Sequence, residues 1–73
     1  MQGDLDGAIA DCTRAIEIDP RGPIAYAVRG LARLGREEDA EAEQDFTKCL
    51  ELDGSLKRWI EREAEEIGKK RAR

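Results

Sequence analysis

Apolar residues recur along this chain at the three- and four-residue spacing of amphipathic helices, in four segments separated by glycine and proline. The pattern predicts helices over residues 4–19, 23–34, 38–53 and 55–70. Because turns of two to four residues join them, we expect these helices to pack as antiparallel hairpins. The apolar stripes are Ala8, Ile9, Cys12, Ala15 and Ile16; Ile24, Ala27, Val28, Leu31 and Leu34; Ala42, Phe46, Cys49 and Leu50; and Leu56, Trp59, Ile60, Ala64 and Ile67.

Residues suited to helix ends lie between these stripes. Asp4 and Ser55 are predicted N-caps, because short polar side chains accept hydrogen bonds from the free amides of a first turn. Pro20 is expected to end the first helix, and Pro23 suits the first position of the second. Gly35 is predicted to end the second helix in the left-handed conformation.

The chain also matches itself when it is shifted by 34 residues. A self-match at this period is typical of helical solenoid repeats, which bury their apolar faces by stacking on neighbours. Such stacking leaves a broad surface for other chains, so the repeat favours a binding scaffold. The identities are Ala8 with Ala42, Asp11 with Asp45, Thr13 with Thr47, Glu17 with Glu51 and Asp19 with Asp53.

The repeated positions resemble the signature of the tetratricopeptide repeat (TPR) family. Tyr26 and Gly30 match the large residue and the glycine of its first helix. Ala42, Phe46 and Cys49 match the small, aromatic and small residues of its second helix. Small residues let paired helices approach, and the aromatic ring fills the gap between hairpins.

The resemblance covers residues 2–54 and implies an all-α fold of about four helices, a TPR-like solenoid in a single domain over residues 1–73. The first segment repeats the second-helix pattern and closes with Asp19-Pro20, and the chain starts at the family's turn between helices. That start favours a fragment of a longer array. The implied units are a truncated repeat over residues 1–20, one full repeat over 21–54, and a capping helix with a basic tail over 55–73.

The chain departs from the family pattern around the turn after the second predicted helix. Gly35 falls two residues before the family's turn glycine, whose place Glu37 takes, and Arg33 stands where the family usually has an aromatic residue. Gly54 replaces the closing proline. Since no other helix breaker interrupts residues 36–53, two alternatives stay open here, a hairpin or a continuous helix.

Composition and charge narrow the functional classes. Charged residues make up 41% of the chain, aromatic residues 4%, and the net charge is −4. Residues 37–56 hold eight acids against Lys48, whereas residues 57–73 hold seven bases against four acids. This distribution speaks against nucleic-acid binding. The bases near the end are predicted to form a solvated helix end: Lys69, Lys70, Arg71 and Arg73.

The length of the apolar runs and the N-terminal sequence indicate where in the cell the protein is expected. No run approaches the ~18 residues of a membrane span, so we expect no membrane partner. The N-terminus also has no basic-then-apolar signal pattern. A cytoplasmic, reducing location is therefore the expectation.

Residues for catalysis or cofactor binding are scarce. The chain has no histidine and no phosphate-binding or zinc-binding motif, so we expect neither enzymatic activity nor a cofactor. Cys12 and Cys49 lie on apolar stripes and are predicted to be packing residues. Trp59 is predicted to anchor the last helix in the core. An acidic run is predicted to be a solvated face and no metal site: Glu37, Glu38, Asp39, Glu41, Glu43 and Asp45.

The family resemblance implies a protein or peptide partner held by the first helix of each repeat. The residues on this helix are Ile24, Ala27, Leu31 and Leu34, with Arg29 and Arg33 beside them. The apolar stripe suits an amphipathic segment, or else it packs on neighbouring helices. The two arginines suit an acidic partner, although pairing with the acidic third helix is the favoured interpretation. The family's clamp for chaperone C-termini is not expected, because Ala27 and Leu31 stand at its positions.

The helix missing from the first repeat leads to a second hypothesis. A further copy of the chain would cover the face left without a partner, either side by side or by a swap through an opened turn near Gly35. The alternative function is therefore a self-assembling structural unit, a homo-oligomer without a separate ligand. The predicted self-association face is Ala8, Ile9, Cys12, Ala15 and Ile16.

Overall fold

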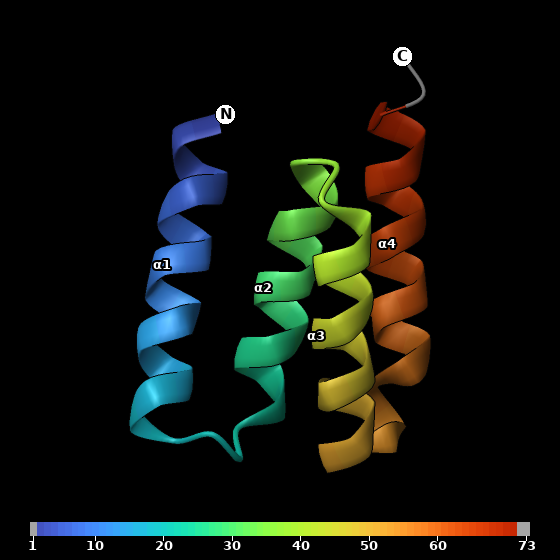
Figure 1. Ribbon diagram of the computed structural model, residues 1–73. Coiled ribbons are helices and arrows are strands. Elements are labelled where there is room, and N and C mark those ends of the chain that lie inside the picture. Colours follow the sequence, from blue (N-terminus) through green and yellow to red (C-terminus); the bar gives the residue numbers. More distant parts are fainter. Residues whose placement is uncertain (1, 72–73) are drawn as a thin grey trace.

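The computed structural model describes residues 2–71, and these fold into four α-helices and one 3-10 turn without a strand. The elements are α1 (Gln2–Ile18), α2 (Pro23–Gly35), α3 (Asp39–Leu52), η1 (Gly54–Leu56) and α4 (Lys57–Arg71). Figure 1 shows successive helices running in opposite directions, with α1 at one side of the bundle and α4 at the other. The predicted all-α fold of antiparallel helical hairpins is confirmed.

Helix α2 holds the fold together, because it packs against α1, α3 and α4. The buried core cluster consists of Tyr26 and Ala27 of α2, Cys49 of α3 and Ile60 of α4. Ile16 of α1 packs against this cluster. All four helices therefore share one small core.

Gly30 lets α2 and α3 approach closely. A Cβ atom at this position would lie 2.6 Å from Cε1 of Phe46 and 3.2 Å from Cβ of Asp45. The first of these distances is too short for any side chain, so the Phe46 ring occupies the space that a residue larger than glycine would need. The family signature at Gly30 and Phe46 thus has a direct packing reason.

The helix ends follow the sequence prediction only in part. Pro23 begins α2, as predicted. Asp4 is no N-cap, because α1 already starts at Gln2 and Asp4 lies in its first turn. Ser55 is no N-cap either, because it lies inside η1. There, Oδ1 of Asp53 accepts hydrogen bonds from Oγ and the backbone N–H of Ser55, at 2.6 and 3.0 Å, and these bonds lower the pKa of Asp53.

The turn between α2 and α3 is a hairpin, which answers the question that the sequence left open. The N–H of Glu38 donates to the carbonyl of Arg33 at 2.8 Å, and the N–H of Glu37 donates to that of Leu34 at 3.0 Å. This pair of bonds is the Schellman motif, whose penultimate residue is left-handed. That residue is Glu37, with φ of 64°. Helix α2 does end at Gly35, but the predicted left-handed conformation is wrong, because no glycine of residues 2–71 has positive φ.

Replacing Glu37 by glycine is therefore expected to stabilise the protein. A residue with a side chain at positive φ destabilises the folded state by about 1 kcal/mol, and glycine removes this strain. Glycine also makes the unfolded chain more flexible, which offsets part of the gain. We expect a net gain of about 0.5–1 kcal/mol in the free energy of unfolding, measured by urea titration. Glu37→Ala is the matched control, because it removes the carboxylate but keeps the Cβ atom. Equal gains in both variants would contradict the backbone explanation.

The anchor of α4 is Ile60 and not Trp59. Ile60 is 4% exposed, whereas Trp59 is 37% exposed, so the prediction that Trp59 is the core anchor is wrong. Consecutive helical residues point about 100° apart, and the two side chains cannot both face α2. The buried or half-buried line of this last segment is Leu56, Ile60, Ala64 and Ile67.

Candidate interaction surfaces

Two arginines of α2 converge on one buried carboxylate of α3. Nε and Nη2 of Arg29 donate to Oδ2 and Oδ1 of Asp45, at 3.0 and 2.8 Å. Nη1 of Arg33 donates to Oδ2 of Asp45 at 3.0 Å. We call these three residues the arginine clamp. Bidentate pairing of this kind fixes both the distance and the orientation of the two helices.

The arginine clamp also reaches α1. Nη1 of Arg29 donates to Oγ1 of Thr13 at 3.2 Å, and that hydroxyl donates to the carbonyl of Ile9 at 2.7 Å. The guanidinium lies 5.8 Å from the ring centre of Tyr26, within the range of a cation–π contact. Hydrogen bonds to Asp45 raise the pKa of Arg29 further. One side chain thus joins three helices.

The clamp decides between the two interpretations of the arginines. Pairing with the acidic third helix is confirmed, since both arginines bind Asp45. The prediction of a solvated acidic face is wrong for Asp45, which is only 3% exposed. The spacing of the acids alone could not single it out. Its 34-residue match to Asp11 marked the position but not its burial.

The residues of the predicted partner-binding stripe lie in four different surroundings. Ala27 is fully buried and has no surface to offer a partner. Leu31 lines a groove of about 480 Å³, whereas Leu34 lines a different groove, between α3 and α4, with Phe46 and Ile60. Ile24 is 52% exposed. Of the predicted stripe, Leu31 lines the groove beside α4, and Ile24 is exposed outside that groove.

The groove beside Leu31, which we call the α2–α4 groove, also includes residues outside the predicted partner-binding stripe. Its apolar walls come from Leu5 of α1, Leu31 of α2 and Ile67 of α4. Its charged rim consists of Glu37, Lys70 and Arg71. The helical stripe of the last segment contained Ile67, but Leu5 joins only through the packing of α1 on the end of α2.

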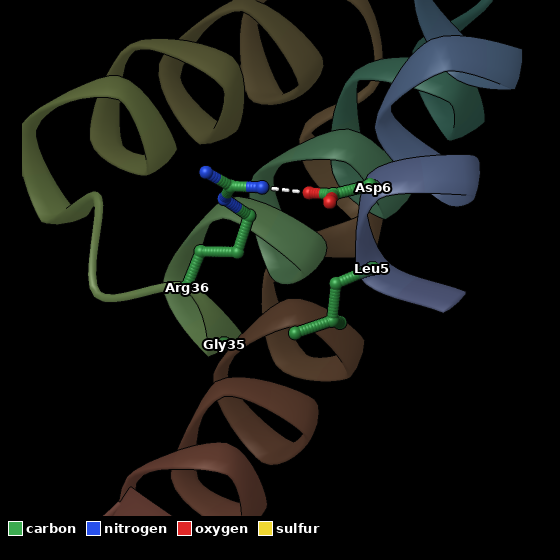
Figure 2. A pocket seen from close by; sticks show the side chains of 4 residues that line it. All are labelled: Leu5, Asp6, Gly35 and Arg36. Carbon is green, nitrogen blue, oxygen red and sulfur yellow. Dashed lines mark ion pairs between the residues drawn. The ribbon is translucent and has the colours of Figure 1, made fainter. Parts of the chain in front are cut away.

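Leu5 lies against the end of α2, in a neighbouring pocket of about 300 Å³ (Figure 2). A Cβ atom on Gly35 would lie 3.2 Å from Cδ1 of Leu5, so the glycine leaves room for the leucine. Asp6 pairs with Arg36 beside it, as Figure 2 shows, and Nε of Arg36 also donates to Glu38 at 3.1 Å. These contacts fasten α1 to the turn that follows α2.

The basic end of α4 is exposed, and Arg71 in it contacts α2 and α3. Nη1 of Arg71 donates to Oδ1 of Asp39 at 2.9 Å and to the carbonyl of Leu34 at 3.3 Å. The predicted solvated helix end holds for Lys69, Lys70 and Arg71, which are all exposed, although Arg71 also forms these surface contacts. Arg73 lies outside the described residues. The pair with Asp39 holds one wall of the α2–α4 groove against the start of α3.

The predicted self-association face is split by the packing of α1 on α2. Ile16 packs against the core, and Ile9, Cys12 and Ala8 are half-buried. Ala15 is exposed. Ile18, which the prediction did not include, is 79% exposed. The uncovered part of this helix is therefore narrower than the apolar stripe suggests.

The two cysteines have the surroundings of packing residues. Cys49 is fully buried, Cys12 is half-buried, and neither forms a disulfide. Burial raises the pKa of both thiols, which disfavours the nucleophilic thiolate. Within residues 2–71, no group of three or more cysteines or acids is arranged to hold a metal ion. No helix in this range is both long and apolar enough to cross a membrane.

Comparison with known proteins bears on the repeat. A family model described as tetratricopeptide repeat matches residues 2–21, which comprise α1 and most of the turn after it. Neither curated proteins nor solved structures give a match. Tetratricopeptide repeats are in general non-catalytic modules for protein–protein interaction. The family match over residues 2–21 and the four-helix hairpin fold together confirm the resemblance of this chain to the tetratricopeptide repeat family.

Proposed function

We propose that this protein binds a partner peptide or helix in the α2–α4 groove. The observation that carries the proposal is a groove of about 480 Å³ with apolar walls from three helices and a charged rim. Its volume falls within the usual range for ligand sites, and its walls are fixed by the core and by ion pairs. A partner would thus meet a surface that needs little ordering before binding.

The walls and the rim suggest the chemistry of the partner. Leu5, Leu31 and Ile67 favour an apolar side chain, and Lys70 on the rim favours an acidic residue next to it. Arg71 is already paired with Asp39, so Lys70 is the rim cation that we expect to meet the partner. An amphipathic segment with one acid beside its apolar residues fits these features.

The test selects peptides and then asks where they bind. The wild-type chain is used to select binders from a displayed library of random 16-residue peptides. Leu31→Lys and Lys70→Glu are each expected to weaken the selected peptides at least about tenfold, a loss of about 1.4 kcal/mol. Leu52→Lys is the matched control, since Leu52 is 36% exposed at the end of α3 and outside the groove. Affinities are measured by fluorescence anisotropy, and circular dichroism checks that each variant is folded.

Two results would contradict the proposal. Selected peptides that bind both groove variants as well as the wild type would place the binding surface elsewhere. If the wild-type chain forms oligomers and the Leu31→Lys variant is monomeric, the alternative function is favoured, in which the groove serves self-assembly.

A further inference from the structure

The internal repeat allows the two flanks of the bundle to be compared residue by residue. In α3, three residues beside Phe46 are buried: Ala42 and Cys49 are fully buried and Asp45 is 3% exposed. The residues 34 positions earlier are Ala8, Asp11 and Ala15 of α1. Ala8 is half-buried, whereas Asp11 and Ala15 are exposed. The same repeat positions are thus covered in α3 and largely uncovered in α1.

Helix α2, which covers this face of α3, shows which residues a helix needs in order to pack on it. Gly30 of α2 leaves room for Phe46, and Arg29 and Arg33 on either side of that glycine bind Asp45. The requirements are therefore a small residue at the crossing point, an arginine directly before it and another three residues after it. These three positions let the helix approach and neutralise the buried carboxylate.

The equivalent face of α1 is open to a further helix. Figure 1 shows α1 at the side of the bundle, with α2 on one flank and no element of residues 2–71 on the other. α1 contacts α2 through Leu5, Thr13 and Ile16, and Asp11 and Ala15 stay exposed beside these contacts. Asp11 forms none of the ion pairs found among the described residues.

We propose that Ala8, Asp11 and Ala15 of α1, the α1 face, bind a helix of a partner protein that carries the sequence pattern of α2. In α1, Cys12 stands at the repeat position of Phe46, and the partner helix presents a small residue opposite it. The partner helix also carries one or two arginines that bind Asp11. The proposal is independent of the α2–α4 groove, because none of the residues of the α1 face lines that groove.

Charge argues against a second copy of this chain as the occupant. The helix that lies 34 residues after α2 is α4, which offers Ala64 at the place of Gly30. It offers Glu63 at the place of Arg29 and Ile67 at the place of Arg33. Stacking α4 of one copy on α1 of another would set Glu63 against Asp11 without a cation, and such like-charge contacts oppose association. Helix α2 itself is already engaged on α3.

The probe for this proposal is a fluorescein-labelled peptide of residues 21–38, which contains the whole of α2. We expect it to bind the folded chain, as measured by fluorescence anisotropy at 0.15 M salt, and Asp11→Asn to weaken binding at least about tenfold. Glu17→Gln is the matched control, because it removes the same charge from the same helix at an exposed position away from the face. Leu31→Lys is expected to leave this affinity unchanged, which separates the α1 face from the proposed groove.

A charge reversal tests the pairing directly. Asp11→Arg is expected to abolish binding of the wild-type peptide, and a peptide carrying Arg29→Asp and Arg33→Asp is expected to restore it. Equal affinities of the wild-type chain and Asp11→Asn for the peptide, or no binding at all, would overturn the proposal. Self-association of the chain that disappears in Asp11→Asn, detected by analytical ultracentrifugation, would also overturn it in favour of a second copy.

Discussion

Replacing Asp45 by alanine is expected to lower the free energy of unfolding by about 3 kcal/mol, although the residue belongs to an acidic run. The side chain of Asp45 is 5% exposed and those of Arg29 and Arg33 are 15% and 23% exposed. Removing the carboxylate leaves two guanidinium groups partly buried without their partner, a change that typically costs about 3–5 kcal/mol. The residual exposure of the arginines places the expected loss at the lower end of this range.

Urea titration followed by circular dichroism measures this loss. A domain of this size holds only about 3–5 kcal/mol from its core, so we expect a large unfolded fraction of Asp45→Ala even without denaturant. Glu66→Ala is the control, since Glu66 pairs with Lys69 on the exposed side of α4 and should contribute below about 0.5 kcal/mol. A loss under about 1 kcal/mol for Asp45→Ala would mean that packing alone aligns α2 with α3.

The helices were predictable because their information is local and repeated. Each apolar stripe follows the period of a helix, and the 34-residue match indicates independently that the segments are repeated helical units. Pro23 could be placed at the start of α2 because a missing amide costs nothing there. The pairing of Arg29 and Arg33 with α3 followed from opposite charges on neighbouring helices.

What could not be predicted depends on distances between helices. Asp45 is buried whereas Glu41 and Glu43 are exposed, and the charge pattern alone does not separate them. Its helical spacing from Ala42 and Cys49 was the signal that placed it on the face toward α2. The turn at Glu37 is set by the Schellman hydrogen bonds, which hold a residue at positive φ in the place where the family has glycine. Leu5 contributes to both pockets beside Gly35 only because α1 packs on the end of α2.

Truncation of Ile60 to alanine is expected to destabilise the protein by about 3 kcal/mol, because Ile60 is the buried residue of α4 and fills the shared core. Deleting three buried carbon atoms typically costs about 2–5 kcal/mol, including the cavity that remains. The loss should fall first on α4, whose other ties to the fold include the exposed pair of Arg71 with Asp39. Amide hydrogen exchange is expected to show α4 losing protection before α1 does.

Trp59→Ala provides the decisive comparison for this assignment. Trp59 is the larger residue, so an anchor role in the core would make its truncation the more damaging of the two. Because Trp59 is 37% exposed and Ile60 only 4%, we expect Ile60→Ala to cost more than Trp59→Ala in urea titrations. If Trp59→Ala cost more than Ile60→Ala, α4 would have to be rotated about its axis relative to its orientation in the structure. Ile67 would then also leave the α2–α4 groove, and the proposed binding surface would lose one of its walls.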